Sequence, residues 1–384
     1  MKTFFYPLLL FILIIFNSCK QESSVVKTKT LDRNAIVDST INAFQQKLLK
    51  IQIDSVFSKY HFNGSVAIFK DSIQIYRKNQ GFADFKTKMP INDSVNFAIA
   101  SISKQFTAAL ILQQVELGKV KLEDKVSQFV KGFKTSEYKN ISIQQLLNHT
   151  SGLNLIGQKL MFKSGEDFNY SNDGYNALGE ILEIVTGKSF DENATELFQK
   201  VGMKNTFTPK TYIGSNFGSA YLGNFKKYAE VPNMPKRLSG GDVGTPAGGI
   251  LSSIDDLHIW NEKLYSGKVL KPETVDMMTT KSATRMHQIF GKMGYGYGIM
   301  LSVGHPKAYF HSGYVKGSPS LNVYYPESKI SVIILSNIAD ETKGKNAVFL
   351  PHKEIKKITD NTEVLTAELR SELLKTQQED NLKK

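Results

Sequence analysis

The sequence contains a single cysteine, Cys19, among 384 residues. One thiol cannot form a disulfide within the chain, and it cannot supply a cysteine-based zinc site. The 28 glycines and 11 prolines follow no three-residue period, which excludes a collagen-like chain. The composition, 41% hydrophobic and 22% charged, is that of a globular protein with a hydrophobic core. The length predicts two or three domains of about 150 residues, or one large α/β domain.

Arginine is also scarce, although the formal net charge is +12. The 48 basic residues include only five arginines, namely Arg33, Arg77, Arg237, Arg285 and Arg370. Sites that read phosphates or bases favour the arginine fork, whereas the lysines here are spread along the chain without a dense run. We therefore expect a solvated basic surface and no nucleic-acid partner. Weak attraction to anionic lipid or acidic wall polymers is compatible with this charge.

The N-terminus has the pattern of an export signal. Lys2 precedes an almost unbroken apolar run over 4–16, which is short for a bilayer span but typical of a signal-peptide core. The run ends at Ser18 and Cys19, and this resembles a bacterial lipoprotein signal in which the cysteine is lipidated. Plain secretion and an uncleaved anchoring signal are the alternatives. We expect a signal peptide over 1–18, then a lipidated Cys19 and flexible tether over 19–40. The protein would be exported to the cell envelope and lipid-anchored to a bacterial membrane, on its periplasmic or outer face.

Strand patterns stand at both ends of the body of the chain. An antiparallel hairpin is predicted at 65–69 and 73–76, directly after an amphipathic helix over 41–60. Strand patterns return at 297–302, 309–311, 320–325 and 330–335. We therefore expect the two ends of the body to meet in one antiparallel sheet.

Helical patterns lie between these strands. Helices are predicted over 103–117, closed by Gly118, and over 175–186, closed by Gly187. Another helix is expected to begin after Ser253 as its N-cap. This order indicates an α/β fold of the α+β type, in which an antiparallel sheet is flanked by helices and a mostly helical subdomain is inserted at about 119–240. A polar C-terminal extension over 346–384 is predicted to hold one helix at 363–377.

The first candidate motif is Ser101-Ile-Ser-Lys104, an S-x-x-K pattern. The same pattern occurs at Ser24/Lys27 and Ser136/Lys139, so alone it is weak, and an N-cap serine beside a solvated lysine is the structural alternative. Only Ser101 opens a long apolar helix. There the two side chains would lie one turn apart, and apolar surroundings would disfavour a charged ammonium. A serine hydroxyl needs such a base within reach to act as a nucleophile.

Two further motifs carry polar groups that could join this pair. Tyr170-Ser-Asn172 is a Y-x-N pattern, whose members point the same way in an extended loop. His311-Ser312-Gly313 is the only H-x-G pattern in the chain, at a strand end, and its glycine would let a substrate backbone approach closely. Each of these two motifs is weak evidence when taken alone. A second Y-x-N pattern occurs at Tyr138/Asn140, and a single histidine on a strand is ordinarily structural.

Taken together and in this order, the three motifs resemble the signatures of serine β-lactamases and penicillin-binding proteins. The Y-x-N form points to the class C branch, which includes D,D-carboxypeptidases, D-aminopeptidases and many esterases. Three flanking segments are similar to the same family, namely LLNHTSGL at 146–153, FNYSNDGYNALG at 168–179 and PAGGILSSIDDL at 246–257. The resemblance covers roughly residues 45–340, and it implies a β-lactamase/transpeptidase-like domain over 41–345.

The resemblance also implies roles. Ser101 would be the acylated nucleophile, and Lys104 and Tyr170 the proton-transfer pair, with the choice of base left open. Asn172 would position the acyl side chain of the substrate. Substrate contacts are further expected from the His311-Ser312-Gly313 strand, and the backbone N–H groups of Ser101 and Tyr314 would form the oxyanion hole.

Two departures from the family pattern bear on the substrate. His311 stands where a lysine is common in the β-lactamases, and a neutral histidine offers less charge to a substrate carboxylate. The segment 154–167 is short for the family, in which it usually contributes to a wall of the substrate pocket. The histidine favours a D,D-peptidase or esterase over a β-lactamase, and the short segment predicts a pocket open to bulky or varied acyl groups.

We therefore expect a serine hydrolase that works through an acyl-enzyme on an amide or ester, as a monomer, with a small-molecule or peptide substrate and without metal or organic cofactor. The alternative is an envelope protein that binds or senses β-lactams or peptidoglycan fragments with slow or no turnover. His149 is expected to be structural, in a tight turn. The Gly248-Gly249 pair lacks the lysine of a phosphate loop and is expected at the pocket edge.

Overall fold

The computed structural model describes residues 21–240, 243–344 and 346–382. The expected signal peptide and Cys19 lie outside these residues. The chain divides into two compact units, one of residues 46–364 and one of residues 1–45 with 365–384. The larger unit contains all three candidate catalytic motifs, at 101–104, 170–172 and 311–313.

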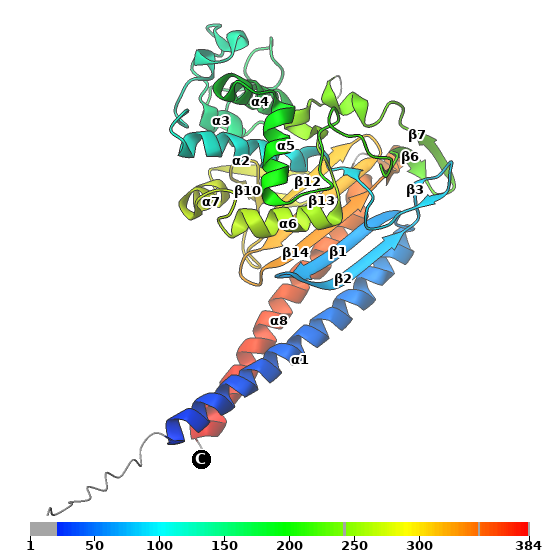
Figure 1. Ribbon diagram of the computed structural model, residues 1–384, viewed down its shortest axis with the longest axis vertical. Helices are drawn as coiled ribbons and strands as arrows, with labels where there is room; N and C mark the ends of the chain where they lie inside the picture. The colour runs from blue at the N-terminus through cyan, green and yellow to red at the C-terminus, as the bar shows by residue number, and fades with distance from the viewer. Residues whose placement is uncertain (1–20, 241–242, 345, 383–384) are drawn as a thin grey trace, which may run out of the picture. The chain divides into compact units, whose positions relative to one another are not determined.

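An eight-stranded sheet forms the centre of the larger unit, in the order β2-β1-β14-β13-β12-β11-β10-β9 (Figure 1). Its strands are β1 (Gly64–Lys70), β2 (Ile73–Gln80), β9 (Ala283–His287), β10 (Gly291–Tyr295), β11 (Met300–Leu301), β12 (Tyr309–Val315), β13 (Ser318–Tyr325) and β14 (Ile330–Ser336). All ladders between them are antiparallel. Gly64 pairs with Ser336, so the N-terminal hairpin joins the last long strand, as the sequence predicts. The edge hairpin β9–β10 was not predicted, because its polar residues and glycines obscure the alternation of a strand.

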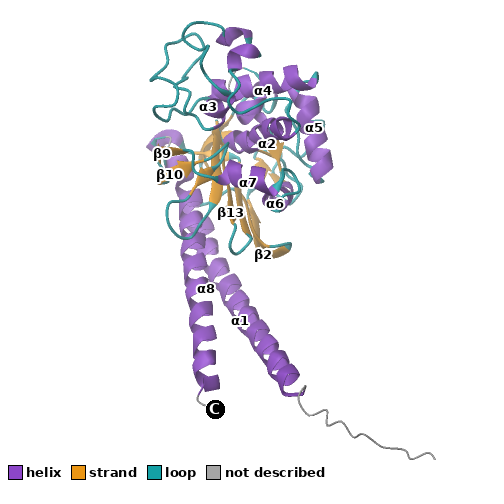
Figure 2. Ribbon diagram, turned by 90° about the vertical axis from the view of Figure 1, so that its left-hand side faces the viewer, coloured by secondary structure: helices purple, strands orange, loops and turns teal. Residues whose placement is uncertain are grey.

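Helices cover one face of this sheet (Figures 1 and 2). They include α2 (Ser103–Glu116), α3 (Ile143–Leu147), α4 (Asn172–Thr186), α5 (Phe190–Val201), α6 (Ile254–Tyr265) and α7 (Pro272–Thr279). Alternate strand residues such as Phe69, Ile333 and Leu335 bury their side chains against these helices in one core. The predicted helix over 103–117 and the N-cap at Ser253, whose side chain accepts from the N–H of Asp256, are confirmed.

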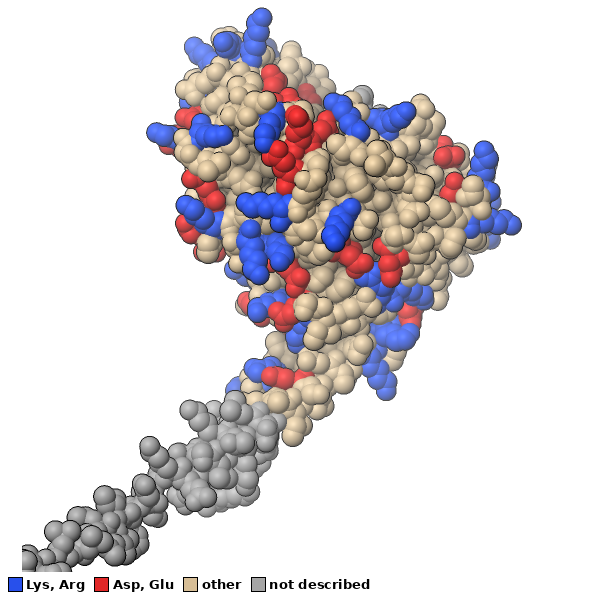
Figure 3. Space-filling model, in the orientation of Figure 1, with Lys and Arg blue, Asp and Glu red and all other residues tan. Residues whose placement is uncertain are grey.

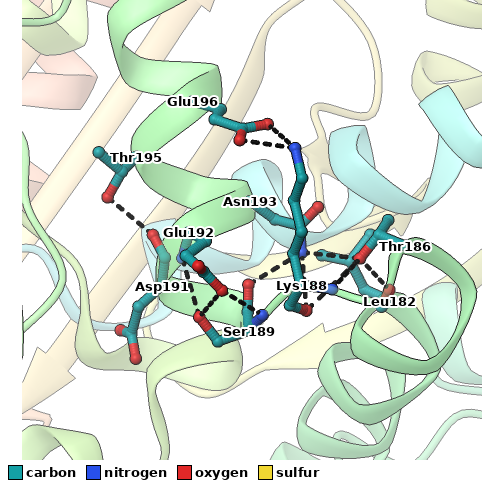
Figure 4. A network of polar contacts seen from close by, with 9 residues as sticks. All are labelled: Leu182, Thr186, Lys188, Ser189, Asp191, Glu192, Asn193, Thr195 and Glu196. Carbon is teal, nitrogen blue, oxygen red and sulfur yellow. Dashed lines mark hydrogen bonds and ion pairs between the residues drawn. The ribbon is translucent and has the colours of Figure 1, made fainter.

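The junction of α4 and α5 shows how local sequence fixes these helices (Figure 4). Gly187 ends α4 with a left-handed φ of 72°, which glycine adopts without strain. Ser189 then starts α5 with a capping box, in which its hydroxyl accepts from the N–H of Glu192 and the Glu192 carboxylate accepts from the N–H of Ser189. Lys188 pairs with Glu196 at 2.6 Å across the first turns.

The opposite face of the sheet is covered by the parts of two long helices that belong to the larger unit. These helices are α1 (Gln21–Tyr60) and α8 (Leu350–Leu382). Ile53 and Phe57 of α1 and Ile355 of α8 are buried there with strand residues of the other parity, such as Ile68 and Val332. Much of the C-terminal segment expected as a polar extension is therefore part of the domain core.

Both terminal segments are more helical than expected. The N-terminal segment was predicted as a flexible tether and the C-terminal segment as holding one short helix. The chain is helical from Gln21 onward and from Leu350 to Leu382. No glycine or proline occurs between Gln21 and Tyr60, so nothing interrupts the predicted helix toward its N-terminal side. In α8 the only such residue is Pro351, which the first turn tolerates. In the smaller unit, Arg370 pairs with Asp38 at 2.7 Å.

The insertion over 119–240 is helical only in part. After α5, β6 (Tyr221–Asn224) and β7 (Lys227–Glu230) form a hairpin, and β15 (Ile338–Ala339) pairs in parallel with β6. Two further short ladders join β3 (Phe82–Asp84) with β4 (Met89–Pro90) and β5 (Phe97–Ala98) with β8 (Leu251–Ser252).

The surface in Figure 3 carries lysines and arginines interspersed with aspartates and glutamates. Among the described helices, none is both long and apolar enough to cross a membrane.

Candidate active site

Ser101 lies in a short 3₁₀ helix, η1 (Ala100–Ile102), that runs directly into α2. Ala100 has a φ of +48°, a left-handed conformation that costs energy for a residue with a Cβ. The segment before it is fixed by the β5–β8 ladder and by a hydrogen bond from Ile99 N to Ile250 O of 3.1 Å. Ser101 is half-buried, whereas Lys104, one turn later, is 0% exposed.

The amine of Lys104 has three oxygen neighbours. Its Nζ lies 2.6 Å from the carbonyl oxygen of Ala247, 2.8 Å from Oδ1 of Asn172 and 3.3 Å from Oγ of Ser101. Burial and, secondarily, the nearby charge of Arg285 lower the pKa of Lys104 well below its ordinary value. A neutral amine would donate its two N–H groups to the two carbonyl oxygens, because these can only accept. Its lone pair would then face the Ser101 hydroxyl.

Tyr170 lies in the loop before α4 and comes close to this pair. Lys104 Nζ is 4.7 Å from the centroid of the Tyr170 ring. The buried Tyr170 hydroxyl has no hydrogen-bond partner of good geometry among the described residues, yet Ser101 is near enough to act on its pKa. Burial raises the pKa of Tyr170 to about 12, against the opposing effects of Arg285 and Ser101. The phenol is therefore neutral near pH 7.

Asn172 begins α4, one residue after the N-cap Ser171. Its Oδ1 accepts from Lys104, which turns the amide so that Nδ2 is free to donate elsewhere. Asn172 is exposed, so a ligand can reach that donor. The expected role of Asn172, which is to position the acyl side chain of a substrate, is compatible with this orientation.

His311 lies on β12 beside Tyr170, with ring centroids 6.3 Å apart, but both its nitrogens have partners within the protein. Nδ1 lies 2.7 Å from the carbonyl oxygen of Ser312 and must donate to it, so Nε2 accepts from the hydroxyl of Tyr295 at 3.0 Å. Burial, with the charge of Lys104 next, lowers the pKa of His311 well below its ordinary value. The expected substrate contact through the His311 side chain therefore finds no free nitrogen in this arrangement.

Gly313 also has a different use from the expected one. A Cβ added there would lie 2.3 Å from Ile99 O, 2.5 Å from Ser320 Oγ and 2.9 Å from Ala100 Cβ. The close approach is thus made by the chain's own segment before Ser101, where we expected a substrate backbone. Ser312, next to it, is buried. The glycine lets η1 pack directly on β12.

The backbone of β12 offers a donor beside η1. Ser302 N donates to Ala308 O at 3.0 Å, so Ala308 faces β11. Alternate residues of an antiparallel strand face the same neighbour, and Tyr314 therefore points its N–H to the β11 side. The β11 ladder pairs with β12 only at Tyr309 and Phe310, so it ends before Tyr314. The Tyr314 N–H therefore points to the side of β12 beyond the end of β11, as an oxyanion donor requires.

Four contacts of the site were not predicted. The Ala247 carbonyl that binds Lys104 belongs to the Gly-rich segment, which the sequence predicted only at the edge of the pocket. The Oγ1 of Thr107 also donates to this segment, at 2.7 Å from Pro246 O. Tyr295 and Arg285 come from the edge hairpin that was missed. A sequence motif cannot show which backbone carbonyl will contact Lys104. The scarcity of arginine, by contrast, is a signal in the sequence that could have pointed to Arg285.

His149, expected to be structural, supports the Y-x-N loop. Its Nδ1 accepts from the backbone N–H of Ser171 at 3.2 Å, between Tyr170 and Asn172. Burial lowers the pKa of His149 well below its ordinary value, which keeps Nδ1 available as an acceptor. The ring centroids of His149 and Tyr170 are 4.3 Å apart.

Comparison with known proteins gives one protein family, Beta-lactamase, which matches residues 38–350. The chain is 27% identical over 346 residues to penicillin-binding protein 4* of Bacillus subtilis, covering 79% of this chain and 74% of that protein. A penicillin-binding protein homologue from Pyrococcus abyssi superposes with a TM-score of 0.68 and 25% identity, over 81% of this chain and 79% of that one. A D-amino acid amidase from Ochrobactrum anthropi gives a TM-score of 0.69 at 20% identity, over 83% of this chain and 99% of that one, a likeness of fold alone.

Proposed function

The chain belongs to the Beta-lactamase family, and from that premise we propose that it is a serine hydrolase that forms an acyl-enzyme on Ser101. The observation that carries the proposal is the buried Lys104 amine, held by two carbonyl oxygens with its third contact on the Ser101 hydroxyl. A buried lysine with a lowered pKa can remove a proton that a solvated lysine cannot.

We assign the proton transfers from the same contacts. Lys104 takes the proton of Ser101 as Oγ bonds to the acyl carbon of the substrate. The N–H groups of Ser101 and Tyr314 stabilise the resulting oxyanion. The leaving amine or alcohol then takes the proton, through Tyr170, as the acyl bond to it breaks. Water attacks the acyl-enzyme by the same steps, which releases the acid and returns the proton to Ser101. Lys104 is the better base of the pair, because the Tyr170 phenol, with a pKa of about 12, holds its proton near pH 7.

We propose an amide or ester substrate, of the D,D-peptidase or esterase type, in preference to a β-lactam. His311 is neutral and both its nitrogens are bound within the protein, so it supplies no cation where β-lactamases commonly have a lysine. The family resemblance to a penicillin-binding protein and the fold likeness to a D-amino acid amidase agree with acyl chemistry on such groups.

The test is covalent labelling followed by turnover. A fluorophosphonate probe should label the purified protein and should not label Ser101→Ala. Turnover of p-nitrophenyl acetate, a D-Ala-D-Ala peptide and nitrocefin should then rank the substrates, with nitrocefin last. Equal labelling of both proteins would end the proposal, and a lead of nitrocefin by orders of magnitude would reverse the substrate preference. A single burst without steady turnover would support the binding or sensor protein instead.

We also propose that the protein is exported and lipid-anchored through Cys19, on the sequence pattern alone. Expression in a bacterium fed with radiolabelled palmitate should give a labelled, membrane-associated protein. Cys19→Ala should lose the label. Release of the unlabelled wild-type protein into the soluble fraction would favour plain secretion.

A further inference from the structure

The backbone and the side chain of Tyr314 have different surroundings. The N–H belongs to the proposed oxyanion hole and points to the side of β12 beyond the end of β11. Gly313, the residue before it, packs against the segment that precedes Ser101, on the face of the sheet that carries the nucleophile. Because successive side chains of a strand point to opposite faces, the Tyr314 side chain points away from that face.

The ladders of the sheet do not bond the Tyr314 peptide within the described strands. Tyr314 shares the parity of Ala308, whose carbonyl faces β11. The hydrogen bonds to β13 therefore come from its neighbours Gly313 and Val315, and β11 has ended before this point. The position of the Tyr314 N–H thus depends on its chain neighbours and on what holds its side chain.

Two residues of the C-terminal part of the domain hold that side chain. The Tyr314 hydroxyl donates to Oε1 of Glu341 at 2.5 Å, the short distance of a hydrogen bond to a carboxylate. Glu341 opens a 3₁₀ helix, η6 (Glu341–Lys343), between β15 and α8. The ring of Tyr314 lies edge-on to that of Phe349, with centroids 6.0 Å apart, and packs on the buried cluster to which Phe349 belongs.

Both partners of this hydrogen bond are prepared for it. Asp340, the N-cap of η6, accepts from the N–H of Thr342 at 3.0 Å and from Nδ2 of Asn224 at 2.9 Å, which fixes the start of the helix that carries Glu341. Burial, followed by the hydrogen bond to Glu341, raises the pKa of Tyr314 above its ordinary value. The phenol therefore keeps the proton that it donates.

We propose that Glu341 is a positioning residue for the oxyanion hole: it fixes the Tyr314 side chain and thereby aims the Tyr314 N–H at the developing oxyanion. An oxyanion donor is effective only when it is already in place as the charge develops, so a donor that moves stabilises the transition state less. The proposal rests on the proposed hydrolase function. It gives the segment between β15 and α8, outside the three sequence motifs, a part in the chemistry.

Replacing the carbonyl oxygen of the substrate by sulfur tests the placement of the donor. p-Nitrophenyl acetate develops an oxyanion, whereas its thiono analogue, with C=S in place of C=O, develops a larger and weaker hydrogen-bond acceptor. The readout is the ratio of kcat/KM for the oxygen ester to that for the thiono ester. Tyr314→Phe keeps the ring and loses the hydroxyl, and it should lower this ratio by about tenfold, a part of the roughly 10²–10³ that a whole oxyanion donor contributes.

Glu341→Ala should lower the ratio as much as Tyr314→Phe, and the double variant no further, because both changes remove the same hydrogen bond. The matched control is Tyr60→Phe, which removes another tyrosine–glutamate hydrogen bond, from Tyr60 to Glu354 at 2.6 Å, between α1 and α8. It should leave the ratio within about twofold, because neither residue belongs to the proposed site.

An unchanged ratio, with both esters slowed equally, would show that the Tyr314–Glu341 contact only stabilises the fold, and the proposal would be wrong. Glu341 is half-buried, so Glu341→Ala costs little packing and gives the same test if Tyr314→Phe does not fold. Failure of the hydrolase function itself looks different, because the wild type would then neither turn over the oxygen ester nor take a label on Ser101.

Discussion

The Nζ of Lys104 lies 3.3 Å from the Oγ of Ser101, and its other two polar contacts are carbonyl oxygens. Because carbonyl oxygens cannot donate, they orient the amine so that, when it is neutral, its remaining electron pair faces the serine. Burial lowers the pKa of Lys104 and so favours this neutral form. In the proposed mechanism, this relationship makes Ser101 the nucleophile and Lys104 its base.

Replacing the amine should stop the chemistry and spare the fold. Lys104→Met keeps an unbranched side chain in a fully buried position and removes the base. We expect kcat/KM for p-nitrophenyl acetate to fall by about 10²–10⁴, the usual contribution of a positioned acid or base. Circular dichroism should be unchanged. Activity within tenfold of wild type would show that another group takes the Ser101 proton.

The lowered pKa of Lys104 also predicts a pH dependence of stability. In the window between the folded pKa and the ordinary value of 10.5, the unfolded chain binds a proton that the folded chain does not. Stability therefore rises with pH in that window, by at most about 1.4 kcal/mol per pH unit, and is lost again as the pH falls. Urea unfolding of wild type and Lys104→Met between pH 7 and 10 should show the wild type gaining on the variant. Parallel curves would mean that the amine titrates normally.

The contact of Gly313 with the segment before Ser101 can be tested by adding one methyl group. Gly313→Ala would place a Cβ 2.3 Å from Ile99 O, so the backbone next to the nucleophile must move. We expect a loss of about 1–3 kcal/mol in unfolding free energy and at least about a hundredfold in acylation rate. Gly132→Ala, where a Cβ meets nothing within 4 Å, is the control and should change neither. Full acylation by Gly313→Ala would show that this packing does not position Ser101.

The hydroxyl of Tyr295 is expected to fix the tautomer of His311. Tyr295→Phe removes the hydroxyl that Nε2 of the buried His311 binds at 3.0 Å and leaves that nitrogen unsatisfied. Unfolding free energy should fall by about 1–3 kcal/mol. The ¹⁵N resonances of His311 should show the proton on Nδ1 in wild type. A wild-type spectrum with the proton on Nε2 would reverse the assigned roles of the two nitrogens.

The sequence predicted much of this architecture because local patterns carry it. The β1–β2 hairpin, α2, α4 and the N-cap at Ser253 follow from apolar spacing and capping residues. The site motifs were identified because three weak patterns occur in the order of one family. Chance copies of a motif could be set aside only from their surroundings. In the structure, the hydroxyl of Tyr138, which belongs to the second Y-x-N pattern, contacts Gln158 O and Gly157 N in a separate loop.

The remaining features depend on contacts between distant segments. Nothing local shows that the carbonyl of Ala247 would meet Lys104, 143 residues away in sequence. Tyr295, which hydrogen-bonds to His311, comes from the β9–β10 hairpin, and so does Arg285, which stacks on Tyr170. In that hairpin, apolar and polar residues do not alternate clearly enough to predict strands. His311 and Gly313 lie beside the candidate site, but the groups expected to contact a substrate contact the protein itself.

The central claim is that Ser101 is acylated with Lys104 as its base. Intact-mass spectrometry of the wild-type protein, quenched within a turnover of p-nitrophenyl acetate, measures this most directly. We predict an added acetyl group that peptide mapping places on Ser101, and none on Ser101→Ala or Lys104→Met under the same quench. An unmodified wild-type protein that still hydrolyses the ester, or an adduct on another residue, would contradict the account.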